Sequence, residues 1–391
     1  MENDARLDTM KRVMVAQLEN NLIPFWSSLK DDRFGFTGYV GFDLKRDPDY
    51  VKGCILNSRI LWFFSKAYRL LKDNALLELA LHAYIALKRM VDPENGGVYW
   101  SVNADGSPFD TTKHCYNQAF AIYGLSAFYE VSGDEKALKL ALELFKLIET
   151  KMRDKGGYLE AFNRDFTPAG NEKLSENGVE AARTMNTLLH VLEGYTELYR
   201  VNKDREVKAK LYEILDIWEK HIWNEALSRQ EVFFDHDYNT LIDLYSYGHD
   251  IETSWLMDRT LDVLNDDAMT KRLRPKLMLM ARAILNTAFT RHGLPAEAEN
   301  GIVNQRRDWW VQAETVLGFL NAYRRGEGEE MFEAALNQWE YIKDKVIDKR
   351  PGSEWFSMLD ENDEPQPKPI VEPWKCPYHN GRMMIEVIEN C

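Results

Sequence analysis

The chain alternates between two kinds of helix-forming segment. In the first kind, apolar residues recur every three or four positions and charged residues fill the rest, a pattern typical of a helix with one buried face. In the second kind, apolar residues surround the helix, which indicates burial on every side. The pattern predicts amphipathic helices at residues 5–22, 74–90, 134–151, 204–222, 268–288 and 329–347. It predicts buried helices at residues 57–71, 114–130, 180–200, 249–264, 309–323 and 379–389.

The buried helices recur at a regular interval. One marker residue near the start of each is 57, 70, 63, 61 and 69 residues from the next, and the markers are Arg59, Tyr116, Asn186, His249, Trp310 and His379. This spacing fits one helical hairpin plus a long loop, without obvious sequence identity between repeats. Six helices of each kind in alternation are what two concentric rings require. We therefore predict an all-α fold, an (α/α)6 barrel that forms a single domain over residues 1–391.

The connections between helices predict where the functional cleft lies. Joins from a buried to an amphipathic helix are short, as in residues 131–134, where Gly133 ends one helix and Asp134 caps the next. The reverse joins are long and carry glycine followed by aromatic residues, which indicates short hairpins or turns. Examples are residues 34–36, 96–100 and 156–158. The long loops and the starts of the buried helices therefore share one end of the barrel, and we place the cleft there.

Composition narrows the class of partner. The chain has 63 acidic and 49 basic side chains, a formal net charge of -14. Such a surface repels phosphate backbones and anionic lipids, so we predict no nucleic-acid partner and no membrane partner. The first 26 residues look like an amphipathic helix rather than a signal peptide. The cysteines lack paired spacing, which favours a reduced cytoplasmic protein with free thiols. They are Cys54, Cys115, Cys376 and Cys391.

Three histidines provide the first chemical signal. His190, His249 and His379 each stand in a predicted buried helix. A buried imidazole is costly unless it has a partner or a function, so the three suggest proton transfer on a small, neutral substrate. Glu252 follows His249 by three residues and shares its helix face, where a carboxylate can orient the imidazole or raise its basicity. A satisfied core pair is the alternative interpretation.

Further polar residues fall near the same end of the buried helices. Asn186, His190 and Glu193 share one helix face, and a polar stripe on a buried helix must face a polar network or a water-filled cavity. Arg59 stands among apolar neighbours, so it either pairs with a buried carboxylate or faces an oxyanion. The positive ends of the helix dipoles meet here as well, which favours developing negative charge.

Metal and cofactor chemistry find little support in the sequence. It contains no HExxH motif, no cysteine–histidine cluster, no P-loop, no GxSxG and no dinucleotide fingerprint. The positive charges of Arg59 and Arg382 would also disfavour a bound cation. We therefore predict neither a metal nor a cofactor.

Several stretches carry a family resemblance. Residues 58–63, 96–100, 247–252, 309–314 and 374–382 are spread over nearly the whole chain, and the last of them reads WKCPYHNGR. At these residues the chain resembles the cellobiose 2-epimerases of the N-acylglucosamine 2-epimerase superfamily. The resemblance implies the same (α/α)6 barrel that the periodicity predicts. It also implies interconversion of the reducing-end glucose and mannose units of β-1,4-linked disaccharides of the cellobiose, lactose and mannobiose class.

The resemblance further implies roles for individual residues. His249 and His379 would form the general acid/base pair, and His190 would assist ring opening or charge stabilisation. Substrate binding or enediolate stabilisation would fall to Arg59, Tyr116, Asn186, Glu252, Trp310, Trp374 and Arg382. Trp309 competes with Trp310 for contact with the sugar.

Other functions remain open from the sequence. An (α/α)6 glycoside hydrolase would need two carboxylates flanking the scissile bond, and Glu176, Glu252 and Glu314 are candidates. A non-catalytic sugar-binding protein would need neither His249 nor His379. Within the superfamily, an aldose–ketose isomerase or an N-acylglucosamine 2-epimerase would use related chemistry. We expect a monomer or a weak homodimer.

Overall fold

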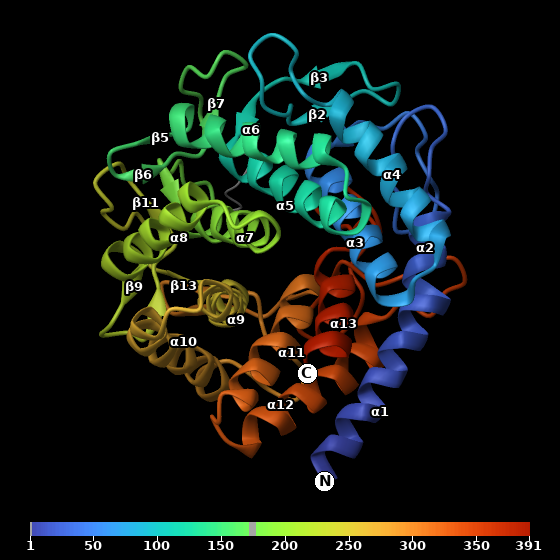
Figure 1. The fold of residues 1–391 in the computed structure, drawn as a ribbon. Helices are drawn as coiled ribbons and strands as arrows, with labels where there is room; N and C mark the ends of the chain where they lie inside the picture. The colour runs from blue at the N-terminus through green and yellow to red at the C-terminus, as the bar shows by residue number, and fades with distance from the viewer. Residues whose placement is uncertain (1, 172–176) are drawn as a thin grey trace.

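The computed structural model describes residues 2–171 and 177–391, which form two concentric rings of helices (Figure 1). The inner ring consists of α3 (Cys54–Leu71), α5 (Cys115–Ser132), α7 (Met185–Asn202), α9 (Tyr247–Leu264), α11 (Trp309–Arg324) and α13 (His379–Asn390). The outer ring consists of α1 (Glu2–Gln17) with α2 (Ile23–Ser27), α4 (Asn74–Arg89), α6 (Glu135–Lys151), α8 (Arg205–Ile217), α10 (Asp267–Thr287) and α12 (Glu329–Tyr341). The predicted (α/α)6 barrel is confirmed.

The inner ring closes on itself through helix packing. Each inner helix contacts the next one along the chain, and α13 contacts both α11 and α3. Each outer helix from α4 to α12 covers the inner helix before it, whereas α1 covers α13. The first and last helices of the chain therefore complete one repeat together. At the tenth residue of α5, α7 and α11 (Gly124, Gly194 and Gly318), a Cβ would approach a backbone oxygen of the preceding inner helix to 2.5, 2.7 and 2.9 Å. Glycine thus allows these helices to pack closely.

The helices differ from the prediction in two respects. The last turns of three outer helices end within one residue of the predicted bounds but are π-helical: η1 (Leu18–Leu22), η3 (Trp218–Ile222) and η4 (Ile342–Val346). The helix predicted at 180–200 instead begins at Met185. Its start is fixed by Thr184, whose hydroxyl accepts a hydrogen bond from the backbone N–H of Thr187 at 3.0 Å. The residues just before it form a strand, because they pair with residues 233–234.

Short joins repeat one motif. Four inner helices end on a residue with left-handed backbone, followed at once by an aspartate whose carboxylate caps the next outer helix. The pairs are Lys72–Asp73, Gly133–Asp134, Lys203–Asp204 and Asn265–Asp266. The cap predicted at residues 133–134 is therefore confirmed, and it recurs in three other repeats.

Long joins contain short antiparallel strands, as predicted. Strands that lead into an inner helix pair with a strand of the following long loop, which links neighbouring repeats. These pairs are β1 (Lys52–Gly53) with β2 (Ser101–Val102), β4 (Lys113–His114) with β7 (Ala161–Phe162), β8 (Arg183–Thr184) with β11 (Phe233–Phe234), β12 (Leu244–Tyr245) with β13 (Glu297–Glu299), and β15 (Arg307–Asp308) with β16 (Met358–Leu359).

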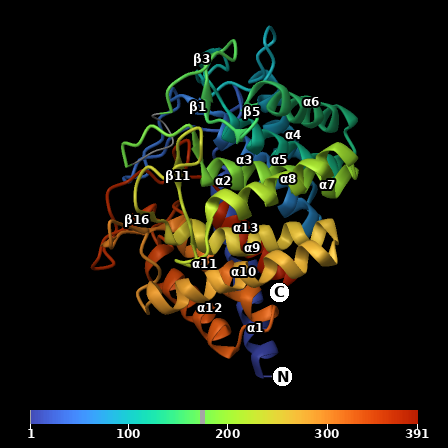
Figure 2. The same ribbon diagram turned by 90° about the vertical axis from the view of Figure 1, so that its left-hand side faces the viewer.

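Six further strands complete hairpins within the long loops. They are β3 (Pro108–Asp110) beside β2, β14 (Ile302–Asn304) beside β13, and the pairs β5 (Arg153–Asp154) with β6 (Gly157–Tyr158) and β9 (Trp223–Asn224) with β10 (Arg229–Gln230). In the side view of Figure 2, β11 and β16 lie with the long loops at one end of the barrel.

Ion pairs with a buried cation anchor three of these strands. A cation two residues before an inner helix binds a carboxylate in the loop that leaves the preceding outer helix. The pairs are Lys52–Asp31 (2.7 Å), Lys113–Asp92 (3.1 Å) and Arg183–Asp154 (2.6 Å). Each cation is buried, so it needs this carboxylate to offset its desolvation. The ion pairs thereby hold the entry of each of these inner helices against the previous repeat.

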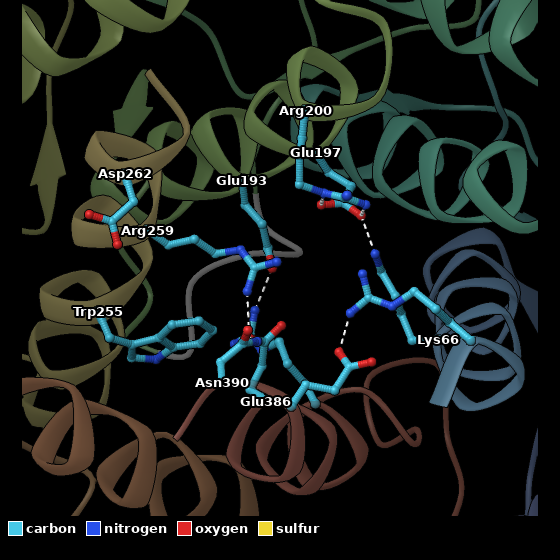
Figure 3. Close-up of polar contacts among 12 residues, drawn as sticks. Lys66, Glu193, Glu197, Arg200, Trp255, Arg259, Asp262, Glu386 and Asn390 are labelled. Atoms are coloured by element: carbon cyan, nitrogen blue, oxygen red, sulfur yellow. Dashed lines mark hydrogen bonds and ion pairs between the residues drawn. The ribbon is translucent and has the colours of Figure 1, made fainter. Parts of the chain in front are cut away.

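Ion pairs also close the opposite end of the barrel, where the inner helices finish (Figure 3). Lys66 of α3 contacts Glu197 of α7, and its Nζ lies 2.6 Å from Glu130 Oε2. Arg259 of α9 pairs with Glu386 of α13 at 2.5 Å. Among the described residues, no helix combines the length and apolar character needed to cross a bilayer.

The buried ion pair between Lys113 and Asp92 leads to a prediction about stability. Replacing Lys113 by Met removes one of the two cations that bind the fully buried Asp92, while Arg164 remains at 2.9 Å, and the loss of this charged hydrogen bond should cost roughly 2 kcal/mol of unfolding free energy. Lys45 is a matched control, because its pair with Asp43 at 2.8 Å is mostly exposed. Lys45→Met should leave the free energy of unfolding almost unchanged, because solvent screens an exposed pair. Urea denaturation followed by circular dichroism measures the free energy of unfolding of both variants. Equal losses in the two variants would contradict a stabilising role for the Lys113–Asp92 ion pair.

Candidate active site

A cleft of about 540 Å³ opens at the end of the barrel where the inner helices begin. All six inner helices of the described chain contribute to its wall. The contributors predicted from the sequence are Arg59 (α3), Tyr116 (α5), Asn186 and His190 (α7), His249 and Glu252 (α9), Trp310 (α11) and His379 (α13). Trp374, in the loop before α13, and Trp309 line the cleft as well. The structure therefore brings nearly all predicted site residues together.

Arg382 is the exception, because it lies beneath the cleft rather than in its wall. Its side chain is completely buried. The guanidinium donates to three carboxylates that come from three other inner helices: Glu193 through Nη1, and Glu252 (2.5 Å) and Glu314 (2.7 Å) through Nη2. Arg382 thus supports the cleft from below instead of contacting its contents.

His249 and His379 share one compartment. Both imidazoles pack against the indole of Trp310, with ring centroids 4.8 Å and 5.6 Å from it. Gly248 permits this arrangement, since a Cβ at that position would lie 2.6 Å from the Trp310 ring. The two histidines come from α9 and α13, which do not neighbour each other in the ring, so they approach the cleft from different sides.

The imidazole of His379 is oriented by a carboxylate. Its Nδ1 lies 2.7 Å from Glu314 Oε1. Glu314 is itself fixed by Arg382 and by Trp255, whose indole N–H donates to Oε2 at 2.9 Å. A carboxylate on one ring nitrogen sets the tautomer and leaves the other nitrogen, Nε2, for the cleft.

The predicted pairing of His249 with Glu252 is wrong. His249 Nδ1 lies 2.7 Å from the hydroxyl of Ser246, the residue just before α9. Glu252 turns instead to Arg382 and lies 3.9 Å from His379 Nδ1. The physical reason is that a buried carboxylate gains more from a guanidinium than from a neutral imidazole. Sequence reasoning missed Ser246, whose only signal is its place three residues before His249.

The polar stripe predicted on α7 is confirmed. His190 Nδ1 lies 2.8 Å from Glu193 Oε2. The hydroxyl of Tyr378 and the guanidinium of Arg382 both donate to the other oxygen of Glu193. The His190 ring packs between Tyr116 and Phe120, with centroid distances of 5.0 and 4.8 Å. Each of the three histidines therefore has Nδ1 bound to a protein group, and none has a protein partner for Nε2 within the described chain.

Arg59 is a buried cation without an acidic partner in the described part of the chain. Its Nη2 donates to the Tyr116 hydroxyl at 2.7 Å, and its Nη1 donates to the carbonyl of Trp374 at 3.2 Å. The guanidinium also lies over the rings of Phe120 and Tyr378, at 4.1 and 4.5 Å from their centroids. Of the two interpretations left open by the sequence, pairing with a carboxylate is thus excluded within the described residues, and an oxyanion remains.

Burial and the three carboxylates set the protonation states. Burial, assisted by the nearby His190, lowers the pKa of His249 to about 3, so this imidazole is neutral at neutral pH. Burial likewise lowers the pKa of His379. Burial and the neighbouring Glu314 raise the pKa of Glu252 to about 7. For Glu193, burial opposes ionisation, but the Arg382 charge outweighs it and holds the pKa at about 2. The carboxylates around Arg382 can therefore store a proton beside His379.

The same carboxylates raise the question of a metal. Glu252, Glu314 and His379 each offer one ligand atom within 4.8 Å of the others. Arg382 Nη2, however, donates to Oε1 of both glutamates. Because the guanidinium already supplies the positive charge between them, this trio fits an ion pair better than a metal site.

Two buried acceptors at the cleft have no hydrogen-bond partner among the described residues. They are the side-chain oxygen of Asn186 and Oε2 of Glu252. Buried acceptors without a partner are costly, so both favour a ligand rich in hydroxyl donors. The indoles of Trp310 and Trp374 add flat apolar faces to the same cleft.

Comparison with known proteins identifies the family. The family model described as N-acylglucosamine 2-epimerase (GlcNAc 2-epimerase) matches residues 35–380. The chain belongs to this family. It is 48% identical to a cellobiose 2-epimerase of Eubacterium cellulosolvens, over 97% of this chain and 98% of the relative. It is 43% identical to a cellobiose 2-epimerase of Dictyoglomus turgidum, over 98% of this chain and 99% of the relative. The solved cellobiose 2-epimerase of Bacillus thermoamylovorans superposes with a TM-score of 0.94, at 41% identity over 98% of this chain and all of that one.

The buried position of Arg382 leads to a pH-dependent prediction. In Arg382→Met, three carboxylates lose their counter-charge, which should cost about 3–5 kcal/mol at pH 8. Glu252 already has a folded pKa of about 7 against an ordinary value of 4.5, and losing the guanidinium raises it further. Its protonated form is stabilising below pH 4.5, and this stabilisation disappears as the pH rises through the folded pKa. The melting temperature of the variant should therefore approach that of the wild type at pH 5 and fall well below it at pH 8. Arg6→Met, which breaks a half-exposed ion pair with Glu333, is the control. A melting temperature of Arg382→Met that lies equally far below that of the wild type at both pH values would contradict this account.

Proposed function

We propose that this protein is a cellobiose 2-epimerase, which interconverts the reducing-end glucose and mannose residues of β-1,4-linked disaccharides. Lactose, which shares the β-1,4-linked glucose unit, is expected to give epilactose. The observation that carries the proposal is the pair of imidazoles, the partly buried His249 and the buried His379, which enter one cleft from different helices and pack on the same indole. The family to which the chain belongs makes the protein an isomerase. In such an enzyme, a pair of imidazoles can remove a proton from a carbon and return it.

The reaction requires an acidic C2 hydrogen. Carbon 2 of a closed pyranose is not acidic, so the ring must first open to the aldehyde. A base then removes the C2 proton and gives a cis-enediolate, whose negative charge needs cationic or N–H donors. Arg59, a cation with no acidic partner in the described chain, is suited to this charge. The starts of the inner helices add their dipoles.

Epimerisation also requires proton delivery to the opposite face. The two imidazoles have different hydrogen-bond partners, which suits one of them to act as the base and the other as the acid. His249 is neutral, and the hydroxyl of Ser246 is the only hydrogen-bond partner of its ring among the described residues, so it is ready to act as a base. His379 stands against Glu314 and near Glu252, where the carboxylates store a proton. We assign base to His249 and acid to His379 once a proton from the carboxylate cluster has reached its imidazole, and the roles exchange in the reverse direction.

The remaining residues bind the sugar. The Tyr116 hydroxyl accepts from Arg59, so its own proton is free to reach a sugar oxygen. Asn186 and Glu252 offer acceptors to sugar hydroxyls. Trp310 and Trp374 can pack on sugar rings, and Trp310 is favoured over Trp309 because it touches both histidines. The reaction needs no cofactor, and the buried free thiols fit a reducing cytoplasm.

A glycoside hydrolase is less well supported. Of its candidate carboxylates, Glu176 lies outside the described residues, and Glu314 is buried against His379 and Arg382 rather than in the cleft wall. Glu252 lines the cleft. Within the described chain, the candidates therefore do not provide two carboxylates facing the cleft, as hydrolysis requires.

Incubation with cellobiose in D2O tests the function. We expect 4-O-β-glucosyl-mannose with deuterium at C2, detected by NMR and mass spectrometry. His249→Asn and His379→Asn should each lower kcat by about 10²–10⁴, because each removes a general acid/base. His292→Asn, at an exposed histidine, is the matched control and should keep full activity. Free glucose would support a hydrolase, deuterium at C1 of a ketose would support an isomerase, and binding without turnover would support a sugar-binding protein.

The close packing at Gly248 gives a second prediction. In Gly248→Ala the added methyl group meets Trp310 at 2.6 Å and must displace the indole from both imidazoles. We expect kcat/KM to fall roughly 10²-fold, since ångström-scale misplacement of catalytic groups has effects of this size. Gly318→Ala crowds the same pair of helices against Ile251 without touching Trp310. It should lower the melting temperature while retaining most activity per folded molecule, and equal activity losses would contradict a role for the Trp310 position.

A further inference from the structure

Residues 372–378 lead into the last inner helix by an irregular path. All of them belong to the described chain, and they form neither helix nor strand. They lie between Val371, which pairs with Val40, and His379, where α13 begins. Trp374, which lines the cleft, is one of them. A segment without a ladder of backbone hydrogen bonds depends on side-chain contacts for its position.

Glu354 supplies two of these contacts. It belongs to the loop between η4 and β16, and its side chain is completely buried. Oε1 accepts a hydrogen bond from Lys375 Nζ at 2.6 Å, and Oε2 accepts one from Asn380 Nδ2 at 2.9 Å. Lys375 and Asn380 are completely buried as well. One carboxylate therefore binds the residue directly after Trp374 and the residue directly after His379.

We propose that Glu354 is a positioning residue for the epimerisation: it fixes Trp374 through Lys375, and it fixes His379 through Asn380. This inference rests on the proposed function, which assigns sugar binding to Trp374 and proton transfer to His379. Glu354 acts from behind the cleft and does not touch the sugar. Because its two oxygens serve two different neighbours, the loss of each contact should have a different kinetic effect.

The contact with Lys375 supports Trp374. The carbonyl of Trp374 accepts a hydrogen bond from Arg59 Nη1 at 3.2 Å, so the peptide after Trp374 lies between Arg59 on one side and the Lys375–Glu354 pair on the other. Separating this buried ion pair would leave two unpaired charges in the interior, which keeps the pair together. The indole is a binding contact that does not react. Its loss should therefore weaken the ground state and the transition state alike, and raise KM.

The contact with Asn380 supports His379. His379 is the first residue of α13, and Tyr378 before it makes no side-chain cap for the helix. Asn380 instead ties the first turn to Glu354. The ring of His379 is bound by Glu314, so the imidazole is fixed both at its ring and at its backbone. His379 moves a proton in the transition state, so its displacement should lower kcat.

Two variants remove one contact each without leaving a buried charge unpaired. In Glu354→Gln/Lys375→Met both charges are lost together, which need not cost stability. The amide oxygen of this variant can still accept from Asn380 and from the backbone N–H of Trp355, which both donate to Oε2 in the wild type. Asn380→Leu removes the other contact and leaves the ion pair in place. If either variant does not fold, Glu354→Gln alone and Asn380→Ala replace them.

Asp348→Asn is the matched control. Asp348 is a buried carboxylate of the same loop, but its side chain binds Arg350 and Ser353, both at 2.6 Å, and no residue of the 372–380 segment. Initial rates of glucosyl-mannose formation are measured over a range of cellobiose concentrations for the full-length wild type and each variant. Circular dichroism and thermal melting give the folded fraction, and kcat is expressed per folded molecule.

We expect Glu354→Gln/Lys375→Met to raise KM about tenfold while kcat stays within about twofold of the wild type. Asn380→Leu should lower kcat by about 10- to 100-fold with little change in KM, because ångström-scale displacement of a proton-transfer group has effects of this size. Asp348→Asn should lower the melting temperature and keep both kinetic constants.

Three results would overturn this role of Glu354. They are a folded variant of either contact that keeps the wild-type kcat and KM, a change in which kcat and KM move together in both variants, or an equal change in Asp348→Asn. Failure of the proposed function looks different, because the wild type itself would then form no glucosyl-mannose from cellobiose.

Discussion

One buried guanidinium, that of Arg382, determines how the centre of this barrel is organised. It donates to Glu193, Glu252 and Glu314, which come from α7, α9 and α11, while Arg382 itself belongs to α13. Four of the inner helices are therefore held at one level along the barrel axis by charge rather than by apolar packing. A single cation cannot neutralise three buried carboxylates, and burial keeps their surroundings poor in water. The cluster relieves this excess of negative charge by retaining a proton and by ordering the imidazoles above it.

The three histidines differ in the group that binds their Nδ1 atom. His379 and His190 each have a carboxylate on Nδ1, whereas His249 has a hydroxyl. A carboxylate stabilises an imidazolium, and a hydroxyl does so far less. The three rings look alike in the sequence, yet the structure gives them unequal partners at Nδ1. Such inequality is useful in an epimerase, because one face of C2 needs a base at the moment when the other needs an acid.

The sequence is informative about burial and much less so about partners. The two classes of helix follow directly from apolar periodicity, since burial on one face or on all faces leaves different patterns. The start of α7 could not be read in this way, because residues 183–184 pair with a strand about fifty residues later. The partner of Glu252 was misassigned for the same reason: local spacing offered His249, but the stronger partner, Arg382, comes from a helix 130 residues away. Ser246 left almost no signal, since a serine before a helix is common as a cap.

The six-fold architecture explains why the site residues occur where they do. Counted from the start of each inner helix, Tyr116, Asn186 and Trp310 are the second residue, and Arg59, His190, Glu252 and Glu314 are the sixth. Residues four apart lie on one face of a helix, so the second and sixth residues point the same way in these helices. Phe120, the sixth residue of α5, keeps the position apolar and packs against both Arg59 and His190. The fold thus supplies equivalent inward positions from helix to helix, and the chemistry arises because each repeat fills them with a different side chain.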